Sequence, residues 1–261
     1  MGKPDSTDDE VKTADATAAE SEETRADAKD DIDELDTAVD DADELDDDDD
    51  DDSDDDEVEG DPDDQSPQTA LFWADVEIDP IEIALPSGTG LTLRHYRSVE
   101  DDDGDPTEEA VLLAHRGKLH LFKTREGLLE FIQSDAPHDL AELESWAQVQ
   151  RRVAVTDLIA IDEDRYELDL VVENLRGGHD MWEPDVLIPA GEVARDIAFA
   201  CELDEVLAAL APGSPLDDLD EGLRDGGFMA RRRLKKVGAE QASIGWRSII
   251  GKITAAVKWH D

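Results

Sequence analysis

Between residues 72 and 123, apolar residues recur at every second position, which is the spacing of β-strands with one buried face. The apolar positions of the first run are Val76, Ile78, Ile81, Ile83 and Leu85. The alternation slips once, at Pro80, where we expect a bulge or a sheet edge. Turn residues at 86–88 and 116–118 divide the stretch further. The pattern therefore predicts a four-stranded antiparallel sheet.

From residue 124 onward, apolar residues are spaced by three and four, which is typical of helices that pack on one side. Thr124 is suited to cap a helix, and a second helix is expected to start near Asp139. Residues 153–161 fit either a strand or a helix. Residues 166–172 alternate as a further strand would, so the sheet would contain four to five strands.

Pro189 is expected to open a helix, because proline fits the first helical turn. A shorter helix at residues 206–210 ends at the Pro-Gly-Ser-Pro of 212–215, and one or two turns follow at 216–223. The last helix begins near Ala239 and carries one apolar stripe. Its members are Trp246, Ile249, Ile250, Ile253, Ala256 and Val257.

Together these elements predict an α+β fold, in which helices cover an antiparallel sheet of four to five strands. We expect three parts along the chain. Residues 1–69 form a disordered acidic tail, and residues 70–225 form the α+β domain. Residues 226–261 form a basic segment with an amphipathic helix that packs on the domain or extends it.

The formal net charge is −48, and much of it lies at the N-terminal end. Residues 1–70 contain 33 acids and four bases, and no aromatic residue precedes Phe72. Such a segment, with its Asp run at 46–52, cannot bury enough apolar surface to offset the entropy lost on ordering. Over most of its surface the protein would repel nucleic acid and anionic membranes and attract basic partners.

The last forty residues reverse this charge, since nine arginines and lysines there face three acids. Basic side chains near aromatic ones can hold phosphates and stack on bases. The candidate nucleic-acid or partner contacts are Arg231, Arg232, Arg233, Lys235, Lys236, Trp246, Arg247, Lys252, Lys258 and Trp259. In a second interpretation the segment docks onto the acidic tail, which would act as an intramolecular competitor. In a third, Trp246 and Trp259 anchor a protein partner. We expect no membrane partner.

The sequence contains few groups that suggest catalysis. Cys201 is the only cysteine, which excludes an intramolecular disulfide and a Cys-based zinc site and favours a cytoplasmic location. The Asp-rich stretches lack the spacing of a calcium-binding EF-hand loop, and the histidines form no metal-binding pair. We therefore predict no catalytic residue, no metal and no cofactor.

Two stretches resemble a family of acidic actinobacterial proteins that commonly carry the labels primosomal protein or DNA primase. These stretches are residues 71–97 (LFWADVEIDPIEIALPSGTGLTLRHYR) and 238–261 (GAEQASIGWRSIIGKITAAVKWHD). The resemblance covers roughly residues 70–261. It implies an accessory role in DNA replication, with DNA or a replication protein as partner. It does not imply polymer synthesis, because one cysteine cannot supply the zinc module of a bacterial-type primase.

The function that we expect is therefore that of a non-enzymatic cytoplasmic interaction protein. Two alternatives remain open. One is a protein–protein adaptor that does not bind nucleic acid. The other is an enzyme with an unrecognised site in a cleft between sheet and helices, which a pocket with convergent polar groups would favour.

Overall fold

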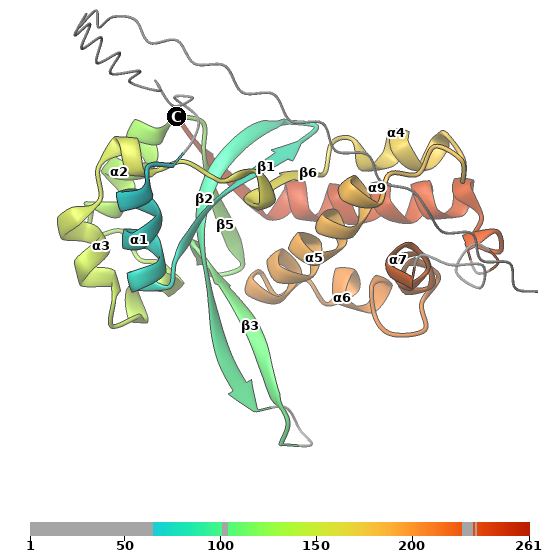
Figure 1. Ribbon diagram of the computed structural model, residues 1–261, viewed down its shortest axis with the longest axis horizontal. Helices are drawn as coiled ribbons and strands as arrows, with labels where there is room; N and C mark the ends of the chain where they lie inside the picture. Colours follow the sequence, from blue (N-terminus) through green and yellow to red (C-terminus); the bar gives the residue numbers. More distant parts are fainter. Residues whose placement is uncertain (1–64, 101–103, 226–231, 233) are drawn as a thin grey trace, which may run out of the picture. The chain divides into compact units, whose positions relative to one another are not determined.

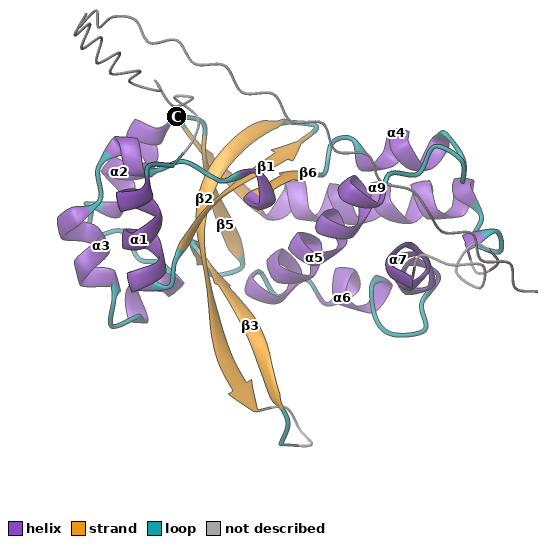
Figure 2. Ribbon diagram, viewed as in Figure 1, coloured by secondary structure: helices purple, strands orange, loops and turns teal. Residues whose placement is uncertain are grey.

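The computed structural model describes residues 65–100, 104–225, 232 and 234–261. Residues 1–64 of the predicted acidic tail lie outside the described residues. In the described part, one sheet lies between two groups of helices (Figure 1 and Figure 2). The fold is α+β, as predicted.

Among the described residues the sheet has seven strands and is mostly antiparallel. The strands are β1 (Asp79–Leu85), β2 (Gly88–Glu100), β3 (Pro106–Leu112), β4 (Ala114–His115), β5 (Lys118–Phe122), β6 (Arg165–Glu167) and β7 (Val257–His260). The strand order is β4-β5-β2-β1-β6, with β3 also paired to β2 and β7 to β5. The β2–β3 hairpin projects beyond both groups of helices (Figure 1).

Two tight turns form where the sequence predicted them. Pro86 and Ser87 connect β1 to β2, and Arg116 and Gly117 connect β4 to β5. Both residues of the second turn have positive φ, 51° and 70°, which suits the right-handed twist of a two-residue hairpin. The sheet is larger than predicted because β7 adds to it in parallel on β5, and because the strand expected at 111–115 is divided between β3 and β4. The further strand expected from residue 166 is β6, which pairs in parallel with β1.

One face of the sheet is covered by short helices. These are α1 (Pro67–Val76), α2 (Arg125–Ile132) and α3 (Trp146–Arg152), with the 3-10 turns η1 (Asp139–Glu142) and η2 (Val155–Asp157). They share a core with the strand residues Leu93 and Phe122 and with Ile78 and Leu113, which flank strands. Thr124 caps α2 as predicted, since its hydroxyl accepts a hydrogen bond from the Gly127 amide at 3.1 Å.

The other face is covered by a larger group of helices. These are α4 (Val171–Arg176), α5 (Pro184–Ala200), α6 (Asp204–Ala209), α7 (Pro215–Asp225) and α9 (Ala239–Ala256). None of the helices in the described part of the chain combines the length and the apolar character that a membrane span requires. The helix predicted from Ala239 is confirmed, and it packs against α4, α5, α6 and α7.

Three local predictions are wrong. Residues 67–76 were expected to end the tail at residue 69 and to begin the first strand run, but they form the helix α1. Their buried positions Thr69, Phe72, Trp73 and Val76 have helical spacing, and Ser66 caps the first turn. The helix around Pro189 begins five residues earlier, at Pro184, and tolerates the second proline in its interior. The alternation at 166–172 gives only the three-residue strand β6, after which α4 starts.

Candidate functional site

The apolar stripe of α9 lies inside the protein. Trp246 is 3% exposed and Ile253 is fully buried, in the core shared by the larger helical group and the sheet. Burial of each such side chain contributes roughly 1.5–3 kcal/mol to stability. Trp246 is therefore a core residue and does not offer a surface anchor for a partner, which corrects the role that its aromatic side chain suggested.

The side chain of Trp259 also packs against the protein itself. It lies on β7, and its indole rests on the start of β2, where Gly90 leaves room for it. A β-carbon at Gly90 would lie 2.7 Å from Cζ3 of Trp259. The indole is partly exposed, but one of its faces belongs to the sheet.

The basic candidates do not gather in one patch. Arg232, Lys235 and Lys236 are exposed before the start of α9, whereas Lys258 is exposed on β7 after its end. The 18 residues of α9 separate these ends by about 27 Å. Between them, Arg247 faces solvent and Lys252 forms an ion pair with Glu205 on α6. Arg231 and Arg233 lie outside the described residues.

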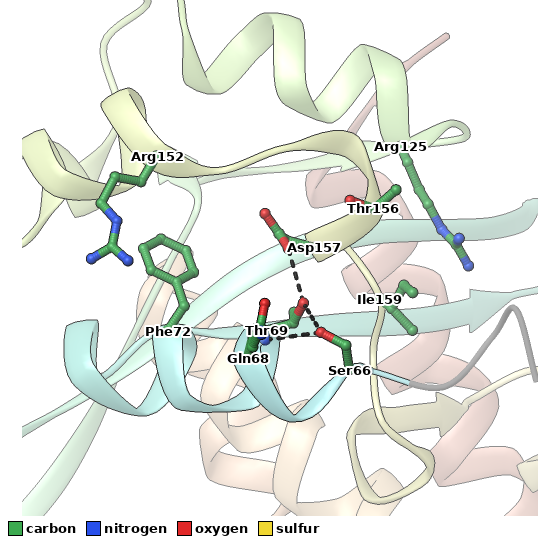
Figure 3. Close-up of a pocket in the computed structure, with 9 residues that line it drawn as sticks. All are labelled: Ser66, Gln68, Thr69, Phe72, Arg125, Arg152, Thr156, Asp157 and Ile159. Atoms are coloured by element: carbon green, nitrogen blue, oxygen red, sulfur yellow. Dashed lines mark hydrogen bonds between the residues drawn. The ribbon is translucent and has the colours of Figure 1, made fainter. Parts of the chain in front are cut away.

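The first of two notable cavities is polar. It has a volume of about 550 Å³ and lies between α1, the start of α2, the end of α3 and η2 (Figure 3). Arg125 and Arg152 line it, together with hydroxyl groups. This is a pocket with convergent polar groups, and no sequence pattern indicated it.

The second cavity, here called the α7–α9 cavity, has a volume of about 730 Å³. It lies between the end of α6, the start of α7 and the first half of α9, and Lys236 stands at its edge. Its walls combine small side chains with the larger Leu216, Asp218, Val237 and Gln241. The small residues are Ala208, Ala209, Gly238, Ala242 and Gly245. The volume is within the range of about 300–1,000 Å³ that is common for ligand sites.

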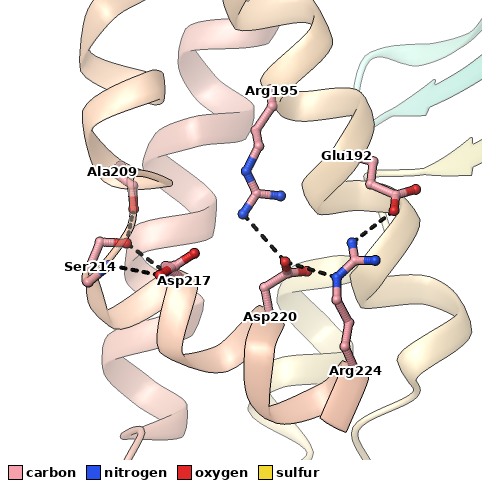
Figure 4. Close-up of polar contacts among 8 residues, drawn as sticks. Glu192, Arg195, Ala209, Ser214, Asp217, Asp220 and Arg224 are labelled. Carbon is pink, nitrogen blue, oxygen red and sulfur yellow. Dashed lines mark hydrogen bonds and ion pairs between the residues drawn. The ribbon is translucent and has the colours of Figure 1, made fainter. Parts of the chain in front are cut away.

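Helix α7 forms one wall of the α7–α9 cavity and is held by polar contacts at two places (Figure 4). Near its start, the Ser214 hydroxyl donates to the Ala209 carbonyl at 2.8 Å and accepts from the Asp217 amide at 3.1 Å. Further along, the Asp220 carboxylate contacts Arg195 of α5 at 3.5 Å and Arg224 at 3.1 Å. These contacts fix the wall in place without filling the cavity.

Gly245 is the residue of α9 that lets α7 approach. A β-carbon there would lie 3.2–3.6 Å from the side chain of Leu216 on α7. Glycine inside a helix costs about 1 kcal/mol, so its presence in α9 is a signal that another element packs closely against the helix. The sequence could not show which element approaches, because residues 208–216 and 236–245 meet only in the folded chain.

A smaller cavity of about 450 Å³ lies at the other end of the α6–α9 contact. It is lined by Asp204 and Glu205 at the start of α6 and by Lys252 and Ala255 near the end of α9. The positions 241 and 255 on α9 are about 21 Å apart along the helix axis. The two cavities therefore lie near opposite ends of the contact between α6 and α9.

A buried charge cluster on β2 has a structural role. Arg94, with a side chain 7% exposed, donates to Asp164 at 2.6 Å and to the Tyr166 hydroxyl at 2.5 Å. Tyr96 donates to Asp196 of α5 at 2.6 Å, and Arg94 lies 4.7 Å from the Tyr96 ring centre. These contacts join α5 to the sheet and hold the Arg94 guanidinium in a buried position, although its Nε has no hydrogen-bond partner among the described residues. Within the described residues, no three potential ligands gather into a metal site.

Comparison with known proteins gives one family. The model of the SatS C-terminal domain family matches residues 78–254, which is more than half of the chain. A crystal structure described as the SatS C-terminal domain in complex with bromine is similar, with a TM-score of 0.59 and 25% sequence identity. The match covers 72% of this chain and 97% of that chain. None of the curated proteins compared with the chain matches it. The resemblance to proteins labelled primosomal stays a prediction.

Proposed function

The chain belongs to the SatS C-terminal domain family, and from this premise we propose that it is a non-enzymatic binding protein that holds a segment of a partner polypeptide in the α7–α9 cavity. The observation that carries the proposal is the cavity itself, in whose walls alanines and glycines lie together with Leu216 and Val237. Such walls accept apolar side chains without requiring one particular shape. A cytoplasmic location, expected from the single cysteine, belongs to this proposal.

The chemistry of the partner segment follows from the edge of the cavity. Lys236 and one acid, Asp218, line it, and Lys235 is exposed beside Lys236, so that the lysines outnumber the acid. Neither lysine forms an ion pair with another residue of the described chain. Ile244, which precedes the lining residue Gly245 in α9, is 56% exposed, which is unusual for an isoleucine in a helix. We expect a segment with an apolar centre and acidic flanking residues, because its carboxylates would neutralise the two lysines.

The length of the segment follows from the helix contact. An extended chain advances about 3.3 Å per residue, so roughly seven residues would span the 21 Å from the α7–α9 cavity to the smaller one. The Lys252–Glu205 ion pair lies at the far end and would mark the limit of the bound segment. Recognition of a short apolar segment in a groove between helices is a common mode of protein binding.

The experiment is fluorescence anisotropy with a labelled nonapeptide that has a leucine and alanine centre and glutamates at both ends. Ala208 is exposed on α6 and lines the cavity, so Ala208→Phe should fill it and weaken binding about tenfold. Ala154→Phe, at an exposed alanine outside the cavity, is the matched control and should bind like the wild type. Equal affinities for both variants would contradict the proposal.

The acidic tail is one possible source of such a segment, since residues 31–45 (DIDELDTAVDDADEL) combine acids with spaced apolar residues. If the tail acts as the intramolecular competitor, an unlabelled peptide of this sequence should displace the labelled nonapeptide. A failure to displace it would remove the competitor role and leave the binding of an external partner untouched.

DNA binding is a second candidate, favoured by one observation. Arg232, Lys235 and Lys236 are exposed close together and form no ion pair within the described part of the chain. A replication-associated role would use this basic turn. Labelled single- and double-stranded DNA, titrated across a salt series, tests it. Loss of DNA binding in Lys235→Glu/Lys236→Glu, with no loss in Ala208→Phe, would favour DNA over a polypeptide.

A further inference from the structure

Along the projecting hairpin, one edge of β2 has no neighbouring strand (Figure 1). Arg94 pairs with Asp79 of β1 on one side of β2 and with Leu112 of β3 on the other. From there β3 continues beside β2 as far as Glu100, whereas β1 begins at Asp79. Among the described strands, residues 95–100 of β2 therefore have a partner on one side only.

The open edge of β2 presents backbone groups at a regular spacing. The two-residue turn makes Leu85 and Gly88 a hydrogen-bonded pair, and every second residue of β2 after Gly88 then directs its N–H and C=O toward β1. Tyr96, Ser98 and Glu100 continue this series beyond the first residue of β1. Within the described chain, no hydrogen bond closes the open side of these three residues. Their N–H and C=O groups are therefore available to another strand.

The outer edge of β3, on the opposite side of the hairpin, is better protected. Pro106 at its start has no N–H to donate, and Ala110 and Leu112 are both buried. On the open edge of β2, by contrast, Tyr96 and Ser98 are exposed, and neither is a proline or a lysine, the residues that commonly block an edge strand. The edge of β2 is therefore the one that accepts a further strand.

A cavity of about 480 Å³ lies beside this edge, between the end of α1, the start of β1 and the β2–β3 hairpin. Its lining includes the acids Glu77, Asp79 and Glu108, and none of them forms an ion pair within the described chain. Arg97, the one arginine in the lining, is already paired with Glu109 at 3.0 Å. The surroundings of the open edge are therefore negative, and they favour a segment with positive side chains.

We propose that the open edge of β2 binds an extended segment of a partner polypeptide that carries lysines or arginines and joins the sheet beside Tyr96, Ser98 and Glu100. Main-chain hydrogen bonds hold such a segment, and the carboxylates of Glu77 and Asp79 select its basic side chains. A second copy of the chain fits this edge poorly, because each copy has a formal net charge of −48. This cavity shares no lining residue with the α7–α9 cavity, so the inference does not rest on the function proposed above.

The test uses the full chain and fluorescence anisotropy with the labelled peptide Lys-Val-Thr-Val-Thr-Val-Lys, which should bind saturably. The same peptide with N-methyl groups on its central residues keeps its charge but loses the N–H groups that a strand donates. It should bind at least tenfold more weakly. A peptide with glutamates in place of the lysines should lose at least as much affinity. No saturable binding of the first peptide, or equal affinity of the methylated one, would overturn the proposal.

Ser98 provides the matched variants. Ser98→Pro removes an N–H from the open edge and leaves the pairing of β2 with β3 intact, because this N–H points away from β3. It should weaken peptide binding at least tenfold, whereas Ser98→Ala should bind like the wild type. Urea unfolding shows whether both variants keep the fold. Equal affinities of the two folded variants would contradict strand addition at this edge.

Two further measurements complete the test. Glu77→Gln leaves the backbone groups of β2 in place and should weaken binding about threefold, and it serves in place of Ser98→Pro if that variant does not fold. Unchanged affinity in Glu77→Gln would contradict the selection of basic side chains. Ala208→Phe should bind the basic peptide like the wild type, which separates this site from the α7–α9 cavity. In analytical ultracentrifugation, a wild-type dimer that Ser98→Pro dissociates would show that a second copy fills the edge and would overturn the basic partner.

Discussion

The indole of Trp259 lies directly on the backbone of Gly90, so that a β-carbon at Gly90 would come within 2.7 Å of Cζ3. The two residues are 169 positions apart in the sequence. Their contact holds the last strand, β7, against β5 and covers the beginning of β2. The C-terminal residues are thus part of the sheet and do not extend from it.

Gly90→Ala should destabilise the protein by about 1–3 kcal/mol, because the added methyl group overlaps Trp259 and the Leu121 side chain. Urea unfolding followed by circular dichroism measures this. In the Gly90→Ala/Trp259→Leu double variant, part of the lost stability should be recovered, since the smaller side chain makes room for the added methyl group.

The control is Gly251→Ala on the exposed side of α9, where nothing lies within 4 Å. This change should stabilise by about 0.5–1 kcal/mol through helix propensity, and a similar loss at both glycines would contradict the contact.

The buried cluster on β2 gives the second prediction. Arg94→Met should cost about 3–5 kcal/mol, because it leaves the carboxylates of Asp164 and Asp196 without their buried cation. Arg97 is three residues further along the strand and pairs with Glu109 at 3.0 Å, but its side chain is 53% exposed. Arg97→Met should therefore cost less than about 1 kcal/mol. Comparable losses of unfolding free energy for the two variants would show that the buried ion pairs of Arg94 stabilise the fold no more than the exposed pair of Arg97.

The sheet was predictable from sequence because alternation and turn residues are local signals. The turn at Arg116 and Gly117 is an example, since its positive φ angles need only two neighbouring residues. The parallel strand β7 was not predicted, and β6 was expected only as a longer strand at 166–172, without its parallel pairing. Each pairs with a strand far away in the sequence, and a run of three or four residues carries no period of its own.

The basic segment also shows that a local sequence pattern does not reveal contacts between distant segments. The stripe containing Trp246 correctly predicts an amphipathic helix, yet amphipathicity does not tell whether the apolar side meets a partner or the protein's own core. Here α4 to α7 cover that side. The two cavities depend on contacts between distant segments, such as Leu216 with Gly245, and these have no local signature.

The third prediction concerns Cys201, which is 3% exposed at the end of α5. Burial first, and the nearby Asp139 carboxylate second, raise the pKa of its thiol to about 11. Since the thiolate is the reactive form, the native protein should resist Ellman's reagent at pH 8 and react fully in concentrated urea. Because Cys201 is the only thiol, its labelling rate reports unfolding directly. Rapid labelling of the native protein would mean that the end of α5 opens far more often than its packing indicates.

The last prediction concerns pH and the histidines around β7. His260 Nε2 lies 3.0 Å from His120 Nδ1, and the two rings are stacked, so at least one of the facing nitrogens must be unprotonated. Burial first, and the neighbouring His260 second, lower the pKa of His120 to about 4; burial and then His115 lower the pKa of His138 to about 4. In the unfolded chain both groups have a pKa near 6.5. The unfolded state therefore binds more protons than the folded state between pH 6.5 and 4, and stability is retained above this window and lost as pH falls through it.

We expect a loss of about 2 kcal/mol between pH 7.5 and 5.5, measured as the free energy of unfolding in urea. Carboxylates that also titrate are common to wild type and variant, so the comparison with His120→Gln/His138→Gln isolates the histidines. The double variant should be less stable at pH 7.5 but nearly flat down to pH 5.5, and an unchanged slope would show that other groups cause the acid sensitivity.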